Sequence, residues 1–365
     1  MIRVGVVGCG RVAQARHLPI IAGLAGAELA AICEVDSATR QRLAGQYALK
    51  AAFESYRELV GYESLDAVMV AAPTQHHAEI GIAALEAGKH VMIEKPLALS
   101  LDEVDRLEAA ASVSGKVAAV AMNSRWHRLS RKTRDVVRSG TLGRPGLLRS
   151  VFTDDYRIVG NPRSWMMEHK NAGCVLVEQA VHHFDLWQFL LDSEVVEIYA
   201  KMHDPSTKGE RAAVTATMAN GVIVSAMFSE GLKGVNELEI YGDQGRVSLS
   251  MYDFDGFDIS PRSEYPGSMG PRLRRLKESL SALPGALRRK KTGGDWAGSY
   301  RTEWQHFIDC IRYDKQPECG IEQGRRALAV GLAAMASLAE RAPVRIAKAP
   351  RNILPYMDGS ELGSK

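Results

Sequence analysis

The sequence VGVVGCGRVAQARH, residues 4–17, decides the fold of the N-terminal part of the chain. It places the pattern G-x-G-x-x-A at Gly8, Gly10 and Ala13, directly after a strand-like apolar run and at the start of a helical one. Gly8 permits a tight turn, and Gly10 lets the backbone approach a pyrophosphate closely. The small Ala13 allows a helix to pack against the strand. The pattern therefore predicts a dinucleotide-binding βαβ unit.

An acidic residue at the end of the second strand-like run strengthens this prediction. Glu34 follows Gly10 at close to the roughly 20-residue spacing at which a carboxylate binds an adenosine ribose. Such a carboxylate accepts hydrogen bonds from both ribose hydroxyls and repels the 2′-phosphate of NADP, so NAD is predicted over NADP. Arg40 would moderate this repulsion if it reached back, but we expect it on a solvated helix face.

Short apolar runs alternate with helical patterns through the first third of the chain. The strand-like runs are residues 3–7, 29–33, 67–71, 90–93 and 117–121. Segments of helical period, 76–87 and 101–112, lie between them. This alternation predicts the α/β class, with a doubly wound parallel sheet in a Rossmann dinucleotide-binding domain over residues 1–123.

The pattern changes after residue 123. A helical stretch at 131–139 precedes strand-like runs with hairpin-type spacing, at residues 147–153, 195–202, 212–218, 222–229, 237–241 and 246–251. They predict an α+β domain over residues 124–348, with a large and mainly antiparallel open sheet for substrate binding and oligomerisation. A tail would follow at 349–365. We expect residues 261–295, rich in Pro, Gly, Arg and Lys, and the chain after Pro350 to be the least ordered parts.

The overall composition is that of an ordinary globular protein. The chain has 365 residues, and its 46 basic and 43 acidic residues give a net charge of +3, so no nucleic-acid or membrane partner is expected. The five cysteines form no CxxC pair, which favours a reducing cytoplasm over a disulfide framework. The basic segment 272–291 is an exception to the balance. We expect a solvated face there, with a phosphorylated or nucleotide-linked sugar as the alternative partner.

Residues 175–187, VLVEQAVHHFDLW, place charged groups in an otherwise apolar stretch. Glu178 and His182 are four residues apart, so on a helix they share one face, and Asp185 follows on nearly the same stripe. Such a face could hold a metal, but the sequence has neither HExxH nor a clustered Cys/His set, and no metal site is predicted. The other reading is a proton relay, because oxidation of an alcohol releases a proton that a histidine can accept near neutral pH.

Further motifs occur along most of the chain. They are Pro73 with His77, AALEAGKHVMIEKP (83–96), NSRW (123–126), GCVLVEQAVHHFD (173–185), YGDQGRVSL (241–249) and YRTEWQHFIDCI (300–311). With the glycine pattern at the start, they resemble the glucose-fructose oxidoreductase, inositol dehydrogenase and MocA family of nicotinamide-dependent sugar and polyol dehydrogenases. The resemblance runs from residue 1 to about residue 346, and the EKP motif followed by acid-x-x-x-His is specific to this family.

The resemblance implies roles for three side chains. His182 would be the general acid/base, Lys95 would polarise or protonate the substrate oxygen, and Glu178 would orient or polarise the site. Many members carry Asp at the position of Glu178, and the longer side chain is expected to shift contacts to the substrate hydroxyls. For His183, core packing and a substrate contact are equally expected. Asp185 is expected to be a structural partner of an arginine or a backbone group.

Binding residues follow from the same motifs. The predicted cofactor contacts are Gly8, Gly10, Arg11, Val12, Glu34, Ala72, Pro73, His77, Glu94 and Lys95. The predicted substrate contacts are Lys95, Asn123, Arg125, Tyr156, Arg163, Trp165, Glu178, His182 and His183.

We therefore expect an NAD-dependent dehydrogenase or ketoreductase that acts on a secondary hydroxyl or keto group of a sugar, inositol or sugar derivative. The family implies a homodimer or homotetramer. Two alternatives remain open. One is a glycosidase or lyase that uses tightly bound NAD for a transient oxidation, and the other is a non-catalytic NAD-binding regulator.

Overall fold

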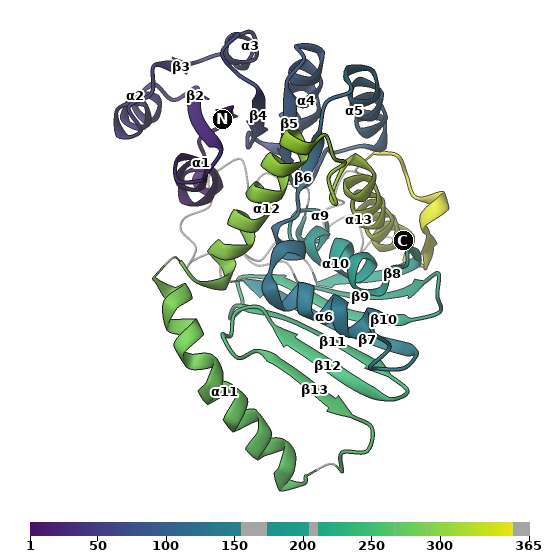
Figure 1. Cartoon of the computed structure of the whole chain (residues 1–365). Helices are drawn as coiled ribbons and strands as arrows, with labels where there is room; N and C mark the ends of the chain where they lie inside the picture. The colour runs from purple at the N-terminus through teal and green to yellow at the C-terminus, as the bar shows by residue number, and fades with distance from the viewer. Residues whose placement is uncertain (155–173, 204–210, 266, 292, 353–365) are drawn as a thin grey trace. The chain divides into compact units, whose positions relative to one another are not determined.

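The chain folds into two compact units in the computed structural model, and Figure 1 labels their helices and strands. The structure describes residues 1–154, 174–203, 211–265, 267–291 and 293–352. The first unit comprises Met1–Asn123 and Tyr300–Leu328, and the second comprises Ser124–Ser299 and Ala329–Lys365. The sequence prediction assigned 300–328 to the second domain. The structure places this segment in the first unit.

Two buried contacts explain this reassignment. The indole Nε1 of Trp304, on α12 (Gly294–Tyr313), donates to Nδ1 of His17 at 2.9 Å. The backbone N–H of Val120 donates to the carbonyl of Cys319 at 2.9 Å, just before α13 (Ile321–Glu340). Both bonds join the returning chain to the first sheet and its helices.

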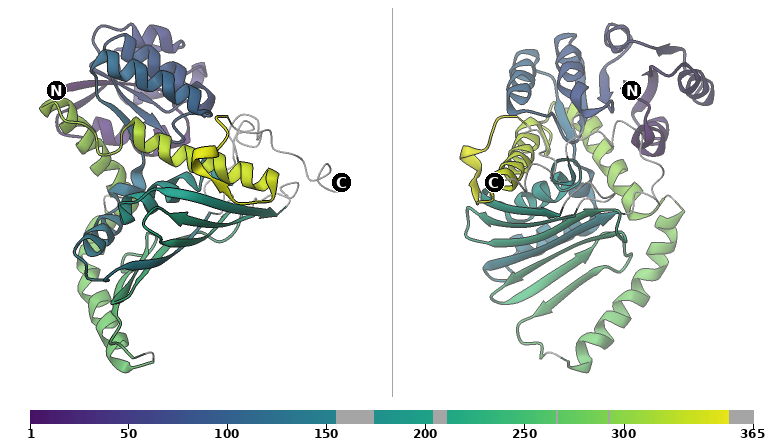
Figure 2. Two further views of the ribbon diagram at one scale, coloured as in Figure 1. Left: turned by 90° about the vertical axis from the view of Figure 1, so that its right-hand side faces the viewer. Right: turned by 180° about the vertical axis from the view of Figure 1, so that it is seen from behind.

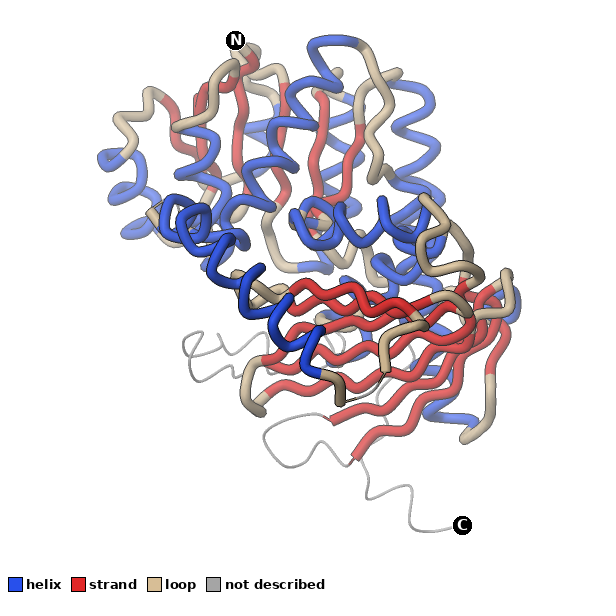
Figure 3. Tube along the Cα trace, turned by 60° about the horizontal axis from the view of Figure 1, so that its bottom comes forward, coloured by secondary structure: helices blue, strands red, loops and turns tan. Residues whose placement is uncertain are grey.

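The first unit is built on a six-stranded parallel sheet (Figure 3). Its strands are β1 (Ile2–Val7), β2 (Ala27–Cys33), β3 (Ala51–Phe53), β4 (Ala67–Val70), β5 (His90–Glu94) and β6 (Ala118–Ala121). Their order is β3-β2-β1-β4-β5-β6, and every neighbouring pair is parallel. This order is that of a Rossmann fold, which confirms the predicted α/β class.

Helices connect these strands. They are α1 (Leu18–Ala22), α2 (Ser37–Gln46), α3 (Tyr56–Val60), α4 (His77–Glu86) and α5 (Leu101–Ser114). α5 has strong local start and stop signals. The side chain of Ser100 accepts from Glu103 N–H, the Glu103 side chain accepts from Ser100 N–H, and Gly115 ends the helix with a φ of 62°.

The second unit is built on an eight-stranded sheet, with the order β13-β12-β11-β7-β10-β9-β8-β14. Its strands are β7 (Pro145–Asp154), β8 (Val195–His203), β9 (Arg211–Met218), β10 (Ile223–Glu230), β11 (Val235–Gly242), β12 (Gly245–Ser250), β13 (Phe257–Pro261) and β14 (Val344–Arg345). All neighbouring pairs are antiparallel except β7 and β10. The predicted, mainly antiparallel sheet is confirmed, although the short edge strands β13 and β14 were not predicted.

One face of this sheet carries helices (Figure 2). They are α6 (Arg128–Arg138), α9 (Val175–Glu178) and α10 (Val181–Leu191). Alternate residues of β9 and β10 are buried beneath them, as expected for a sheet with one covered face. The opposite face exposes large apolar side chains, at Leu147, Tyr199, Ile223 and Met227. The helices that carry the predicted catalytic residues of this unit therefore lie on the covered face.

The segment 261–295, predicted to be among the least ordered, contains a long helix. α11 spans Met269–Lys290. Leucines recur every three or four residues from Leu273 to Leu287, which is the spacing of one helix face. The prediction was wrong because it gave weight to the Pro, Gly and charge content and not to this period. In the described ranges, no helix has both the length and the apolar character needed to cross a bilayer.

Candidate active site

The glycine turn after β1 has the geometry that the sequence pattern requires. Gly8 has a φ of +86°, and a Cβ there would lie 2.6 Å from the carbonyl oxygen of Ala71. At Gly10, by contrast, a Cβ would meet nothing within 4 Å. Arg11 and Val12 follow in the first helical turn, ahead of a π-helical turn at Ala13–His17. The turn is thus closed against the loop after β4 and open at Gly10, where a phosphate group could approach.

Glu34 is joined directly to this turn. Its buried carboxylate accepts from Cys9 N–H at 2.9 Å through Oε2 and from Asp36 N–H at 3.1 Å through Oε1. A carboxylate oxygen has two lone pairs, so each oxygen can accept one further hydrogen bond. Glu34 therefore fixes the glycine turn and retains acceptor capacity at the end of β2.

Arg40 reaches back to the same strand end. Its Nη1 donates to the Glu34 carbonyl at 2.5 Å, and its Nη2 pairs with Glu54 Oε2 at 3.1 Å. Its side chain is only 17% exposed, so the expectation of a solvated helix face is wrong. The Glu54 carboxylate and the carbonyl groups at the end of β2 draw the guanidinium inward.

Lys95 follows β5 in a segment anchored by buried hydrogen bonds. Glu94 Oε2 accepts from Lys95 N–H at 3.0 Å, and Glu94 Oε1 lies 2.8 Å from Nε2 of His17. His17 also accepts from the Trp304 indole, which can only donate, so His17 carries its proton on Nε2 and donates it to Glu94. Burial alone would raise the pKa of Glu94, but the His17 hydrogen bond and the Lys95 charge hold this pKa below its usual value.

His77 connects the loops that follow β4 and β5. Its two ring nitrogens lie 2.8 Å from the carbonyl oxygens of Pro96 and Ala72, and burial lowers its pKa. Pro73 begins the short 3-10 turn that leads into α4. In an open parallel sheet, ligands bind outside the carboxyl ends of the strands, which is where these two loops lie.

In the second unit, Glu178 and His182 lie on two short helices and not on one. Glu178 ends α9 and His182 lies in the first turn of α10. Between them the helical ladder is broken, because Ala180 N–H donates to Val175 O and His182 N–H donates to Gln179 O. The prediction of one continuous helical face was therefore wrong. Glu178 is half-buried, and His182 is buried with its ring 6.3 Å from that of Phe152 on β7.

His183 lies in the core of the second unit and is fully buried. Its Nδ1 is 2.6 Å from Ser150 Oγ and its Nε2 is 3.0 Å from Asn236 Oδ1, while Trp187 Nε1 also donates to Ser150 Oγ. Burial lowers the pKa of His183 to about 4. Because both ring nitrogens are occupied, the structure supports core packing and argues against the expected substrate contact.

Arg125 also has a structural position. Its Nε and Nη2 each donate to a carboxylate oxygen of Asp185 at 2.6 Å, and the guanidinium stacks over the Phe189 ring. Both partners are buried, so the pair is shielded from water. Asp185 is the arginine partner that the sequence predicted, and the substrate contact of Arg125 stays a prediction.

The remaining predicted substrate contacts divide into two groups. Asn123 is buried at the end of the first unit. Tyr156, Arg163 and Trp165 lie outside the described residues.

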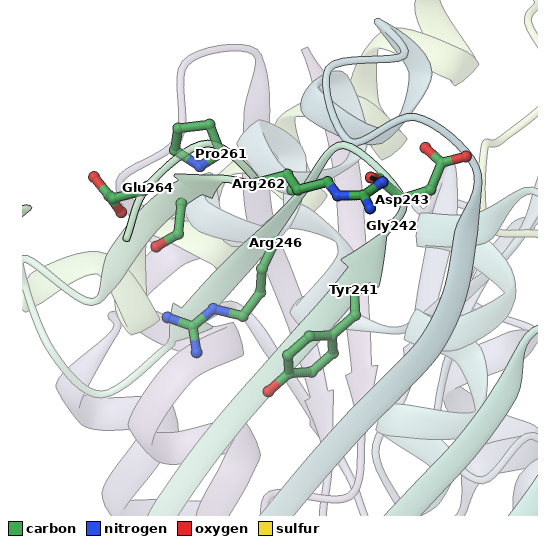
Figure 4. Close-up of a pocket in the computed structure, with 9 residues that line it drawn as sticks. Tyr241, Gly242, Asp243, Arg246, Pro261, Arg262 and Glu264 are labelled. Carbon is green, nitrogen blue, oxygen red and sulfur yellow. Dashed lines mark hydrogen bonds between the residues drawn. The ribbon is translucent and has the colours of Figure 1, made fainter. Parts of the chain in front are cut away.

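A surface hollow of about 390 Å³ lies at the turn between β11 and β12 (Figure 4). It is lined by Tyr241, Gly242, Asp243, Gly245, Arg246, Ser260, Pro261, Arg262 and Glu264. None of the predicted site residues lines it. Two of its charged side chains are already paired, with Arg246 Nη1 3.4 Å from Glu239 and Glu264 bonded to Arg274 at 2.6 Å. We therefore do not place the active site in this hollow.

Sequence reasoning missed two residues beside the predicted site. His17 closes the glycine-rich stretch and supports Glu94, and its place within the first motif was the available signal. Gln179 is 8% exposed, and neither of its amide atoms, Oε1 or Nε2, has a hydrogen-bond partner in the part of the chain that the structure describes. Gln179 lies within the motif at residues 173–185, but no sequence pattern marked it as a ligand contact.

The depressed pKa of His183 predicts a loss of stability in acid. The unfolded chain, with a histidine pKa of roughly 6.5, takes up this proton first as the pH falls, so the contribution of His183 is complete above pH 6.5 and is lost towards pH 4. Between pH 6.5 and 5, His183→Gln should lose about 2 kcal/mol less unfolding free energy than the wild type.

Urea denaturation followed by tryptophan fluorescence at several pH values measures this difference. The matched control is His203→Gln, which replaces an exposed histidine on β8 and should show the wild-type loss. An equal acid loss in His183→Gln and the wild type would contradict the assignment.

Known proteins match both units of the chain. Residues 2–122 match the oxidoreductase family with an NAD-binding Rossmann fold, and residues 134–346 match the C-terminal alpha/beta domain of that oxidoreductase family. Myo-inositol 2-dehydrogenase of Thermotoga maritima is 26% identical over 357 residues, which cover 94% of this chain and 98% of that protein. 1,5-anhydro-D-fructose reductase of Ensifer adhaerens is 27% identical over 340 residues, covering 93% of this chain and 97% of that protein.

A solved structure shows the same fold. Scyllo-inositol dehydrogenase from Lactobacillus casei, with bound NAD(H) and scyllo-inositol, aligns with a TM-score of 0.76 at 18% identity, over 95% of this chain and 100% of that one. Both family models match, and together they span most of the sequence. The chain therefore belongs to the glucose-fructose oxidoreductase, inositol dehydrogenase and MocA family of oxidoreductases, with an NAD-binding Rossmann fold and a C-terminal alpha/beta domain.

Proposed function

We propose that the protein is an NAD-dependent dehydrogenase or ketoreductase that acts on a secondary hydroxyl or keto group of a sugar, inositol or sugar derivative. The observation that carries this proposal is the buried Glu34 carboxylate bonded to the Cys9 N–H of the glycine turn. The substrate class is supported by the relatives, whose names specify inositols and an anhydro sugar.

The residues of the first unit fit a dinucleotide. The open space at Gly10 suits a pyrophosphate, and the remaining lone pairs of Glu34 suit two ribose hydroxyls. A bound nicotinamide would accept the hydride from the alcohol carbon or return it to the ketone. NAD is favoured over NADP because a 2′-phosphate would approach the Glu34 carboxylate. The Arg40 guanidinium, which could offset that charge, is held by Glu54 and the Glu34 carbonyl.

His182 and Lys95 would manage the proton and the charge on the substrate oxygen. A histidine suits the first task because its ordinary pKa lies near neutral pH, so it can accept the hydroxyl proton and return it in the reverse direction. The Lys95 ammonium would stabilise negative charge developing on the oxygen. The bond from Lys95 N–H to Glu94 fixes the backbone from which this side chain extends. Glu178 would favour the protonated form of His182 as the alcohol loses its proton.

We propose that Gln179 contributes to substrate binding. An amide offers both a donor and an acceptor, which suits two neighbouring hydroxyls of a polyol. Leaving such groups buried and unpaired costs about 1–3 kcal/mol each, so a ligand that satisfies them would gain affinity. Its position between Glu178 and His182 places it in the same segment as the proposed catalytic groups.

The proposed activity predicts nicotinamide reduction by the purified protein with at least one member of a panel of inositols, aldoses, uronates and sugar phosphates. NAD should support the higher kcat/KM, with NADP as the second cofactor tested. Lys95→Ala should lower kcat by at least about a hundredfold, because the charge on the substrate oxygen is left unopposed. Lys89→Ala, which removes another lysine of the same motif, is the matched control.

If no compound of the panel is turned over and the cofactor copurifies with the protein, net oxidation would be contradicted and the transient-oxidation alternative favoured. Cofactor binding without turnover on either the polyols or a set of glycosides would favour the regulator. Equal activity in Lys95→Ala and the wild type would remove Lys95 from the site.

The Gln179 proposal predicts separate effects on binding and stability. Gln179→Leu should raise KM for the polyol about tenfold, which corresponds to one lost hydrogen-bonding group of about 1.4 kcal/mol. It should also leave the thermal midpoint unchanged or raised, because an unpaired buried amide is removed. Steady-state kinetics and thermal denaturation measure the two effects.

The control is Gln188→Leu on α10, whose Nε2 donates to the Phe184 carbonyl at 3.0 Å. It should leave KM unchanged. A lowered thermal midpoint with an unchanged KM in Gln179→Leu would show that Gln179 has a structural role.

A further inference from the structure

The helix α11 presents an apolar stripe to solvent. None of its residues is buried, and six large apolar side chains are 42–63% exposed: Met269, Leu273, Leu276, Leu280, Leu283 and Leu287. Their spacing of three and four residues places them on one face. A helix in a soluble domain normally turns such a face towards the core, so the orientation of α11 is reversed.

Two ion pairs on the opposite face and one serine hydrogen bond hold the helix in this orientation. Arg275 Nη2 bonds to Asp258 Oδ2 at 2.6 Å, Arg274 Nη1 bonds to Glu264 at 2.6 Å, and Ser279 donates to Asp255 at 2.7 Å. All three acidic partners lie in or beside β13, at the edge of the sheet along which α11 runs (Figure 2). The polar face is therefore attached to the protein's own sheet, and the leucines point away from it.

Unpaired cations flank the exposed stripe. Residues 269–291 contain eight Lys and Arg residues and a single acid, Glu278, against a net charge of +3 for the whole chain. Within the described ranges, five of these cations have no carboxylate partner: Arg272, Lys277, Arg288, Lys290 and Lys291. At about 100° per residue, all five project within roughly a quarter-turn of the centre of the stripe. The paired Arg274, Arg275 and Arg289 project from the other side.

The sequence of α11 has a low intrinsic helix propensity. Gly270, Pro284 and Gly285 are poor helix formers, and Pro284 removes a main-chain donor within the helix. Without burial of an apolar face, such a sequence gains no packing energy. A surface that covers the leucine stripe would supply it.

We propose that α11 is an interfacial helix that docks the protein on an anionic lipid bilayer. The leucine stripe would enter the boundary between headgroups and acyl chains, while the flanking Lys and Arg side chains reach the acidic headgroups. The same cations disfavour a zipper with α11 of a second copy, because like charges would line both sides of the seam. A nucleic acid would match the charge and leave the stripe uncovered. The near-neutral charge of the whole chain conceals this local concentration.

Vesicle flotation of the full-length protein tests the proposal. The wild type should float with vesicles of phosphatidylcholine mixed with phosphatidylglycerol and not with pure phosphatidylcholine, and added salt should weaken the binding. Leu276→Gln/Leu280→Gln should lower the partition coefficient at least about tenfold. Lys277→Gln/Arg288→Gln should weaken binding and its dependence on salt. The matched control, Ser281→Gln/Ala282→Gln, adds two glutamines to the same helix away from the stripe and should bind like the wild type.

Three results would overturn the proposal. The first is a wild type that stays unbound to the anionic vesicles. The second is equal flotation of the leucine variant and the wild type. The third combines two observations: the wild type does not float, and light scattering without lipid gives the leucine variant a lower molar mass than the wild type. That result would show that a second copy covers the stripe.

Discussion

The buried hydrogen bonds of α10 are the constraint on which the second unit depends. His183 bonds to Ser150 on β7 and to Asn236 on β11, so the helix is fixed to two neighbouring strands. The bidentate pair of Arg125 and Asp185 anchors the same helix two residues further on. Removing one partner of a buried pair costs about 3–5 kcal/mol, because the other charge is left uncompensated. These bonds fix the backbone of α10 beside His182, the residue before His183.

The first unit uses the same arrangement around Lys95. Glu94, the residue before it, is buried and bonded to His17, which in turn accepts from Trp304. Lys95 and His182 are therefore each adjacent in sequence to a buried polar residue that is hydrogen-bonded within its own unit. Such a neighbour fixes the backbone from which the proposed catalytic side chain extends.

The parts of the fold with strong local signals were predictable from the sequence. The glycine turn, the acid of β2 and the alternation of the first sheet rest on short-range patterns. The position of 300–328 was not predictable, because it depends on contacts of Trp304 and Cys319 with residues far away in sequence. The break between α9 and α10 also left no mark in the sequence, since Glu178 and His182 keep helical spacing.

The residues of the candidate site were likewise predictable only where a short-range motif contains them. The motifs assigned charged residues to the site. They did not distinguish residues whose side chains bind other protein groups from residues that would bind a ligand. Arg125 and His183 were predicted as substrate contacts and form buried structural bonds. Gln179 lies within the motif at residues 173–185, but only its burial without partners in the described residues distinguishes it.

The central claim is that His182 transfers the substrate proton, and the pH profile of kcat/KM for alcohol oxidation tests it most directly. The wild-type value should rise with pH to a plateau, because the general base must be unprotonated to accept the substrate proton. His182→Ala should be lower by about a hundredfold or more and should lack this rise, while His76→Ala, at an exposed histidine, should keep it. A His182→Ala profile with the wild-type rise and plateau would contradict the account.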